Sequence, residues 1–279
     1  MMRGVDGLHV ETLGAGDDVV LVHGAFGWGA HTFAEQRVLA DDHRLHILDR
    51  RGYGASVTDG PVGWPVDVVD LVALLERLDG AHLVGHSYGG VDALLVAGAR
   101  PELVHSLVVV EPPIYDLSEH PDVRELTAEL VTLGNDAPLL DGEGFFARWA
   151  DVVLGLHPRA ITYAVHHWSD YDRIASEATR VEAMPMGAPV DWARVRGLDI
   201  PVVVASGGWP TEWRRAELRP RAARAALSFQ DTARVIAERL GVDVVRFPDS
   251  SHMPQITEAA AFNDLLRETW LRSPRTGPC

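Results

Sequence analysis

The chain has 279 residues, of which 47% are hydrophobic and 23% are charged, and its formal net charge is −15 at pH 7. This composition is ordinary for a globular protein made of one large domain or of one domain with an insertion. The negative charge argues against a nucleic acid or an anionic membrane as the partner, because both repel an acidic surface.

The sequence carries few signals of processing or of metal binding. Its single cysteine is Cys279, which leaves no pair for an intrachain disulfide and no cysteine metal cluster. No apolar run reaches the length of a membrane span, and the first residues lack the apolar segment of a signal peptide. We therefore expect a cytoplasmic protein without a membrane partner. The oligomeric state is left open, and a homo-oligomer is compatible with the sequence.

Apolar runs and helical patterns alternate along the first 113 residues. Short runs rich in Val, Leu and Ile predict strands, and apolar residues that recur every three or four positions predict helices. This alternation predicts a mostly parallel twisted sheet with helices on both faces, which is the α/β class. The strands are expected at 8–13, 19–23, 43–49, before Gly85 and at 107–110, and the helices at 32–39, at 67–78 and after Ser87.

The rhythm changes after Pro113. Residues 114–196 show no strong strand pattern, and the aromatic-rich helical segments predicted there are 123–133, 144–156 and 160–175. We interpret 114–196 as a helical cap that is inserted into a core formed by 1–113 and 197–279. That core is completed by expected strands at 200–208 and 242–247 and expected helices at 231–240 and 258–271.

The most informative motif is Gly85-His86-Ser87-Tyr88-Gly89, between a predicted strand and a predicted helix. G-x-S-x-G in this context is typical of a nucleophile elbow, a tight turn that exposes the serine hydroxyl at the carboxyl edge of the sheet. A side chain at 85 or 89 would collide with the neighbouring strand or helix, so both residues must be small. The Tyr88 amide lies at the first turn of the helix, where it can bind a developing oxyanion.

A nucleophilic serine needs a base, and His252 is the histidine best placed to supply it. It follows the last predicted strand and therefore lies at the same carboxyl edge as Ser87. An imidazole can take the hydroxyl proton near neutral pH and return it to a leaving group. The neighbouring pair His166–His167 has no evident third ligand, so we predict no metal site there.

Four segments, in this order along the chain, resemble those of the α/β-hydrolase fold superfamily, in its cap-containing branch with a serine nucleophile. The resemblance implies that Ser87 is the nucleophile and His252 the base. It also implies an oxyanion hole formed by the amides of Ala25 and Tyr88, with Phe26 as the alternative neighbour, and a cap after the strand that ends at Val110. The four segments are His23-Gly24-Ala25-Phe26, Asp49-Arg50-Arg51-Gly52-Tyr53-Gly54-Ala55-Ser56, Gly85-His86-Ser87-Tyr88-Gly89-Gly90 and Ser251-His252-Met253-Pro254-Gln255.

The chain departs from this family at the acid that orients the histidine. Family members commonly carry an Asp shortly after the strand expected here at 200–208, and this chain has no Asp there. Glu212 lies later than expected, whereas Glu111, at the end of the preceding strand, stands at a second position that some lipases use. We favour Glu111, keep Glu212 as the alternative acid, and keep a Ser–His dyad as a third reading.

These residues predict a serine hydrolase that cleaves a small ester, thioester or lactone through an acyl-enzyme, with no metal and no cofactor. Two alternatives stay open. One is a non-hydrolytic enzyme on the same scaffold, such as a C–C hydrolase, lyase or cyclase of secondary metabolism, and the other is a ligand receptor without turnover. An apolar or aromatic part of the small-molecule substrate is expected to contact Phe26, Trp28, Trp149, Trp168 and Trp209.

Overall fold

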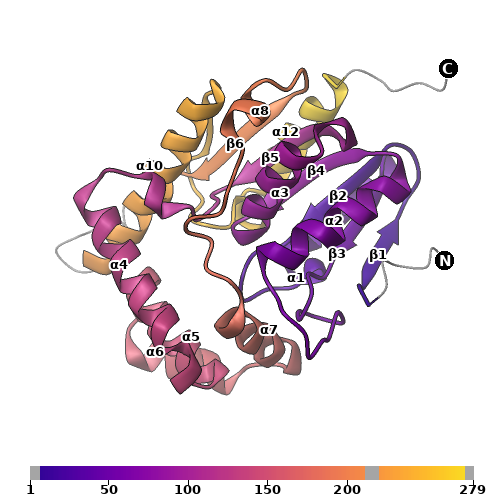
Figure 1. Ribbon diagram of the computed structural model, residues 1–279. Helices are drawn as coiled ribbons and strands as arrows, with labels where there is room; N and C mark the ends of the chain where they lie inside the picture. Colours follow the sequence, from indigo (N-terminus) through magenta and orange to yellow (C-terminus); the bar gives the residue numbers. More distant parts are fainter. Residues whose placement is uncertain (1–6, 211–219, 274–279) are drawn as a thin grey trace.

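The computed structural model describes residues 7–210 and 220–273, and a seven-stranded sheet forms its centre (Figure 1). The strand order is β1-β3-β2-β4-β5-β6-β7. The edge strand β1 pairs antiparallel with β3, and all other neighbours pair in parallel. The predicted α/β class is therefore confirmed. The strands are β1 (Val10–Leu13), β2 (Asp18–Val22), β3 (Arg44–Leu48), β4 (Ala81–His86), β5 (Val104–Val110), β6 (Val202–Gly207) and β7 (Val244–Phe247).

Helices cover both faces of the sheet, which explains why the central strands are apolar without alternation. On one face, α2 (Trp64–Leu78), α3 (Tyr88–Ala99) and α10 (Pro220–Leu240) bury side chains of β2, β4 and β5. On the other face, the 3₁₀ helix η1 (Ala34–Asp41) and α12 (Ala259–Leu271) do so. No helix in the described part of the chain combines the length and apolar character that crossing a bilayer requires.

The segment between β5 and β6 is helical. It contains α4 (Pro121–Asp136), α5 (Gly142–Leu154), α6 (Pro158–His166), α7 (Asp170–Val181) and the short α8 (Trp192–Arg196). We call α4 to α7 the inserted helices; they lie together beside the carboxyl edge of the sheet (Figure 1). Apolar side chains of α4 and α5 form a cluster with Trp209 and with Phe229 of α10. The division into a core and a cap at residues 113 and 197 stays a prediction.

Two helix predictions are wrong in detail. The single helix expected at 160–175 is two helices, because Ser169 starts a new one: its side chain accepts a hydrogen bond from the Asp172 amide, and the Asp172 side chain accepts one from the Ser169 amide. The helix expected at 32–39 is instead a short α1 (Gly29–Thr32), a break at Phe33 (φ −117°, ψ 29°) and η1.

The remaining short elements are turns of helix at the ends of strands and loops. They are η2 (Pro101–Leu103), η3 (Tyr115–Leu117), η4 (Ala137–Leu139) and α11 (Pro254–Thr257). The long helix α10 begins at Pro220, well before the expected start at residue 231. This extension matters for function, because it places Phe229 at the carboxyl edge of the sheet.

Candidate active site

Ser87 lies on a tight turn between β4 and α3, with φ 53° and ψ −121°. Its amide donates to the Val110 carbonyl oxygen at 2.8 Å, which fixes the turn against β5. A Cβ atom on Gly85 would lie 2.2 Å from the Gly89 carbonyl oxygen, and one on Gly89 would lie 2.3 Å from that of Val22. Backbone on both sides therefore leaves no room for a side chain at either position.

Backbone strain gathers around this turn. Among the described residues other than glycine, five have positive φ angles, and four of these are Phe26, Ser87, Glu111 and Trp209. Residues in this region of φ/ψ space persist only where their surroundings hold them, and such residues concentrate at functional sites. The fifth, Asp79, ends α2 in a left-handed conformation.

Glu111 and His252 are in direct contact. The Nδ1 atom of His252 lies 2.7 Å from Oε2 of Glu111, whose side chain is fully buried. The other carboxylate oxygen, Oε1, accepts three hydrogen bonds, and together these contacts compensate for taking the carboxylate out of water. The three donors are the Ser206 hydroxyl at 2.8 Å, the Gly207 amide at 2.9 Å and the Trp209 indole at 2.9 Å.

An aromatic stack supports the imidazole. The His252 ring packs on Phe229 with a centroid separation of 4.2 Å, and Phe229 in turn stacks on Trp209 at 5.4 Å. The stack and the Glu111 contact together fix the plane and the direction of the His252 ring. The alternative acid, Glu212, lies outside the described residues.

His86 supports His252 from the other side. Its Nε2 lies 2.9 Å from the backbone oxygen of His252, and the two rings are 4.7 Å apart. Burial, followed by the charge of His252, lowers the pKa of His86 well below its usual value, so the ring is neutral and donates this hydrogen bond. Among the described residues no hydrogen bond joins the Ser87 hydroxyl to His252; in enzymes such contacts often tighten only when substrate binds.

The predicted oxyanion-hole residues Ala25 and Tyr88 both line a cavity that Ser87 faces. The amide of the alternative residue, Phe26, already donates to the Thr179 hydroxyl at 3.0 Å. This contact favours Ala25 over Phe26 as the second amide. No three His, Cys, Asp or Glu side chains in the described ranges are grouped so that they could hold a metal ion.

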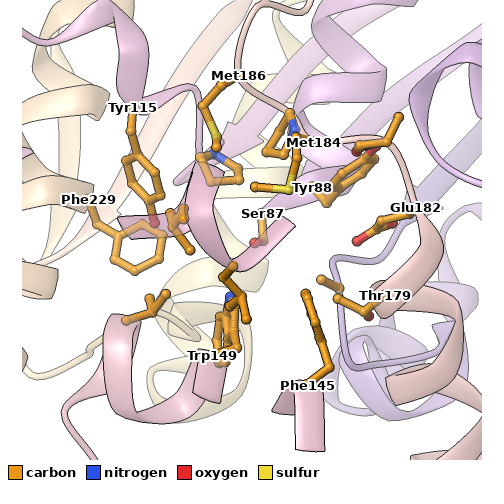
Figure 2. A pocket seen from close by; sticks show the side chains of 17 residues that line it. Ser87, Tyr88, Tyr115, Phe145, Trp149, Thr179, Glu182, Met184, Met186 and Phe229 are labelled. Atoms are coloured by element: carbon orange, nitrogen blue, oxygen red, sulfur yellow. Dashed lines mark hydrogen bonds between the residues drawn. The ribbon is translucent and has the colours of Figure 1, made fainter. Parts of the chain in front are cut away.

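The cavity is mostly apolar, and its walls come from both the sheet edge and the inserted helices (Figure 2). Five of its lining residues are consecutive, and we call this run, residues 182–186, the cavity strap. It follows α7 and carries Glu182, Met184 and Met186 into the cavity wall. A further cavity beside α4 shares these three residues, together with Phe145 and Thr179, with the first. The cavity strap therefore lies between the two cavities.

The aromatic residues that the sequence predicts to bind substrate do not all lie in the cavity wall. Trp149 lines the cavity, and Phe26 packs on it with ring centroids 4.6 Å apart. Neither Trp28 nor Trp168 is among the described residues that line the cavity. Trp28 packs on Tyr171 instead, and Trp168 packs on Phe146. Trp209 is buried and bound to Glu111, which makes it a support of the acid rather than part of the cavity wall.

A buried arginine lies behind the Tyr88 side of the cavity. Arg50, which is fully buried, donates to Asp67 at 2.8 Å and to Glu182 at 3.1 Å, and lies 3.9 Å from Asp92. Burial raises the pKa of Glu182 to about 7 and the pKa of Asp92 well above its usual value. The positive charge of Arg50 opposes this rise but does not cancel it, since three carboxyl groups share one arginine. We call these four residues the buried arginine cluster.

Sequence reasoning did not find the cavity strap or Phe229 as parts of the site. Phe229 lies in the part of α10 that precedes the helix predicted at 231–240. The signal for Glu182 would have been the unusual pair Arg50-Arg51 after a buried strand, since a buried arginine demands carboxylate partners. The sequence does not show where along the chain those partners lie.

Comparisons with known proteins identify the family of this chain. The sequence profile of the alpha/beta hydrolase family matches residues 19–265. A pimeloyl-(acyl-carrier protein) methyl ester esterase of Aeromonas salmonicida is 37% identical over 110 residues, which cover 36% of this chain and 40% of that relative. An sn-1-specific diacylglycerol lipase of Xenopus laevis is 35% identical over 114 residues, covering 39% of this chain and 35% of that one.

The chain thus spans about two fifths of the length of the curated relatives that it matches first. A likeness of fold extends much further. A thermophilic esterase from Thermogutta terrifontis superimposes with a TM-score of 0.66 at 23% identity, over 95% of this chain and 93% of that one. Since the family profile covers most of the sequence, we conclude that the chain belongs to the alpha/beta hydrolase family.

Proposed function

We propose that the protein is a serine hydrolase that cleaves a small carboxylic ester through an acyl-enzyme on Ser87. The observation that carries this proposal is the 2.7 Å contact between His252 Nδ1 and Glu111, beside a serine held on a strained elbow. A carboxylate on Nδ1 leaves Nε2 of the same ring to act as the base. This makes Glu111, rather than Glu212, the acid of the proposal.

In the first half of the reaction, Ser87 Oγ attacks the carbonyl carbon while His252 Nε2 takes the hydroxyl proton. The amides of Ala25 and Tyr88 hold the negative oxygen of the tetrahedral intermediate. Its collapse breaks the bond to the leaving alcohol, which departs with the proton from His252. In the second half, water attacks the acyl-enzyme by the same route and releases the acid and free Ser87.

The cavity favours a substrate with an apolar part. Its wall is made largely of Leu, Phe, Trp, Val and Met side chains, and such walls bind apolar groups through burial of surface. The relatives named as a methyl ester esterase and a diacylglycerol lipase support an ester as the scissile group. We propose, in addition, that residues 114–196 act as a cap that supplies this wall.

Intact-mass spectrometry after treatment with a fluorophosphonate tests the proposal. We expect one adduct on the wild type, none on Ser87→Ala, and labelling of Glu111→Gln slowed by about 10³-fold or more, since an uncharged amide cannot stabilise the imidazolium. Glu212→Gln, the matched control, should label at the wild-type rate. A well-folded wild type that forms no adduct would contradict the proposal and favour the non-hydrolytic or receptor alternatives. The cytoplasmic location and the oligomeric state stay predictions.

A further inference from the structure

Among the 17 described residues that line the cavity, Glu182 is the only charged one. Its side chain is 5% exposed and belongs to the cavity strap. Figure 2 shows it on the same side of Ser87 as Tyr88 and Thr179, while Tyr115 and Phe229 lie on the opposite side. A mostly apolar cavity therefore presents one carboxyl group, at a distinct place relative to the serine.

The protein does not use all the hydrogen-bonding capacity of this carboxyl group. Arg50 donates two hydrogen bonds to Oε2, at 3.1 and 3.2 Å. An ionised carboxylate offers about four acceptor sites. At least one acceptor site thus remains on a carboxyl group that lines the cavity.

The proposed chemistry decides which part of the substrate reaches Glu182. The leaving alcohol must face His252, because it takes its proton from that ring. His252 packs on Phe229, so the alcohol part belongs on the Phe229 side of Ser87. The acyl part then extends toward the opposite side, where Tyr88, Thr179 and Glu182 lie.

We propose that Glu182 sets the acyl specificity of the enzyme by accepting a hydrogen bond from a hydroxyl group on the acyl chain, so that the preferred substrates are hydroxyacyl esters. The inference rests on the proposed function, since it requires an acyl group bound at Ser87. Arg50 holds the carboxylate in place and keeps Oε2 occupied, which directs the remaining acceptor site to the ligand. Apolar side chains around it enclose the rest of the acyl chain.

The test compares matched methyl esters of hexanoic acid that carry a hydroxyl or a methoxy group at carbon 2, 3 or 6, with hydrolysis followed in a pH-stat at pH 8. A methoxy group accepts hydrogen bonds but cannot donate one. For at least one position we expect the hydroxy ester to have a kcat/KM about tenfold above that of its methoxy partner, the effect of one hydrogen bond to a charged acceptor. The difference should lie mainly in KM if the bond is equally strong in the bound substrate and the transition state.

The variants separate recognition from a merely structural role. In Glu182→Gln the amide oxygen would accept from Arg50, which turns the NH₂ group toward the cavity, so the hydroxy-to-methoxy ratio should fall to about 1 or below. Glu182→Met should also bring the ratio to about 1, because it removes the acceptor. The matched control is Glu177, an exposed carboxylate on α7 that pairs with Arg180. Glu177→Gln and Glu177→Met should keep the wild-type ratio.

Two outcomes would overturn the inference: wild-type ratios within about twofold of 1 at all three positions, or a high ratio that the Glu182 variants retain. Fluorophosphonate labelling of the same preparations keeps the two proposals distinct. An adduct on Ser87 together with a ratio that does not depend on Glu182 would reject the acyl specificity alone. The absence of both adduct and turnover would reject the proposed function itself.

Discussion

At Glu111, one carboxylate oxygen faces the imidazole and the other accepts three hydrogen bonds, two from the last residues of β6 and one from Trp209 just after it. Ser206 and Gly207 thus occupy the strand end at which the family resemblance implies an acid, and here they donate to an acid from the neighbouring strand. Because β5 and β6 pair in parallel, their carboxyl ends meet at one edge. An acid can therefore move from one strand end to the next and still reach His252.

We predict that Trp209→Phe slows fluorophosphonate labelling of Ser87 by about tenfold, because it removes one hydrogen bond to a charged group while it keeps the ring stack on Phe229. Trp209 acts through Glu111, so the variant should also shift the pH profile of labelling, which a purely structural residue would not do. Stopped-flow labelling between pH 5 and 9 measures both. An unchanged rate and profile would mean that the indole has no part in positioning the acid.

A second prediction concerns the pH dependence of stability. Burial raises the pKa of Glu182 from 4.5 to about 7, so the folded protein binds more protons than the unfolded chain between these values. Stability from this group is therefore present in full below pH 4.5 and decreases as the pH rises to 7, by up to about 3 kcal/mol. Glu182→Gln removes this decrease. Thermal melts at pH 5 and pH 8 should differ less in the variant than in the wild type, and an equal difference would refute the assignment.

At the level of single residues, the sequence alone predicts those site residues that stand in a recognisable local motif. Ser87 lies two residues from Gly85 and from Gly89, Glu111 directly follows β5, and His252 lies in the loop after β7. Glu182 and Phe229 carry no such signal. Each reaches the cavity only through the packing of helices that are distant from Ser87 in the sequence, and nothing local distinguishes them from other core or surface residues.

Among the secondary-structure elements, the junction of β4 and α3 tolerates least change. We predict that Gly89→Ala destabilises the protein by about 2 kcal/mol or more, because its Cβ would meet the backbone of β2 and not a side chain that can rotate away. Gly60→Ala is the matched control, since its Cβ would meet only the Thr58 hydroxyl at 3.2 Å in an exposed loop. Urea denaturation of both variants measures the difference, and equal midpoints would contradict the predicted clash between the new Cβ atom and the backbone of β2.

The helices show why element boundaries are harder to predict than element types. The apolar spacing of 160–175 continues through His167, so periodicity alone joins α6 to α7. Ser169 and Asp172 form a capping box that the pattern of apolar residues does not register. The start predicted for α10 is too late for a different reason: its first turns are rich in Ala and Arg and carry only a weak apolar stripe.

On the scale of the whole molecule, the buried arginine cluster joins the sheet to the inserted helices. Arg50 follows β3, Asp67 and Asp92 lie on α2 and α3, and Glu182 follows α7. We predict that Arg50→Met destabilises the protein by about 3–5 kcal/mol at pH 8, because it leaves buried carboxylates without a cation. The loss should be smaller at pH 5, where the carboxyl groups hold their protons more readily.

The control for this prediction is Arg51→Met. Arg51 pairs with Asp70 at 2.7 Å but is 23% exposed, so we expect a loss of about 1 kcal/mol or less at either pH. Chemical denaturation of both variants at the two pH values provides the comparison. Similar losses of stability at pH 5 and pH 8 for Arg50→Met would mean that the packing of the arginine side chain, and not its charge, joins the sheet to the inserted helices.

The cavity strap has a consequence for how this protein can diversify. Five adjacent residues, 182–186, supply a large share of the wall that faces Ser87, and none of them belongs to the proposed Ser–His–Glu machinery. The codons of residues 183–186, which leave Glu182 and its pair with Arg50 in place, could therefore be randomised to change which esters are accepted while the reaction itself is left intact. Substitutions in the same segment would also let duplicated genes diverge in the range of esters that their products hydrolyse.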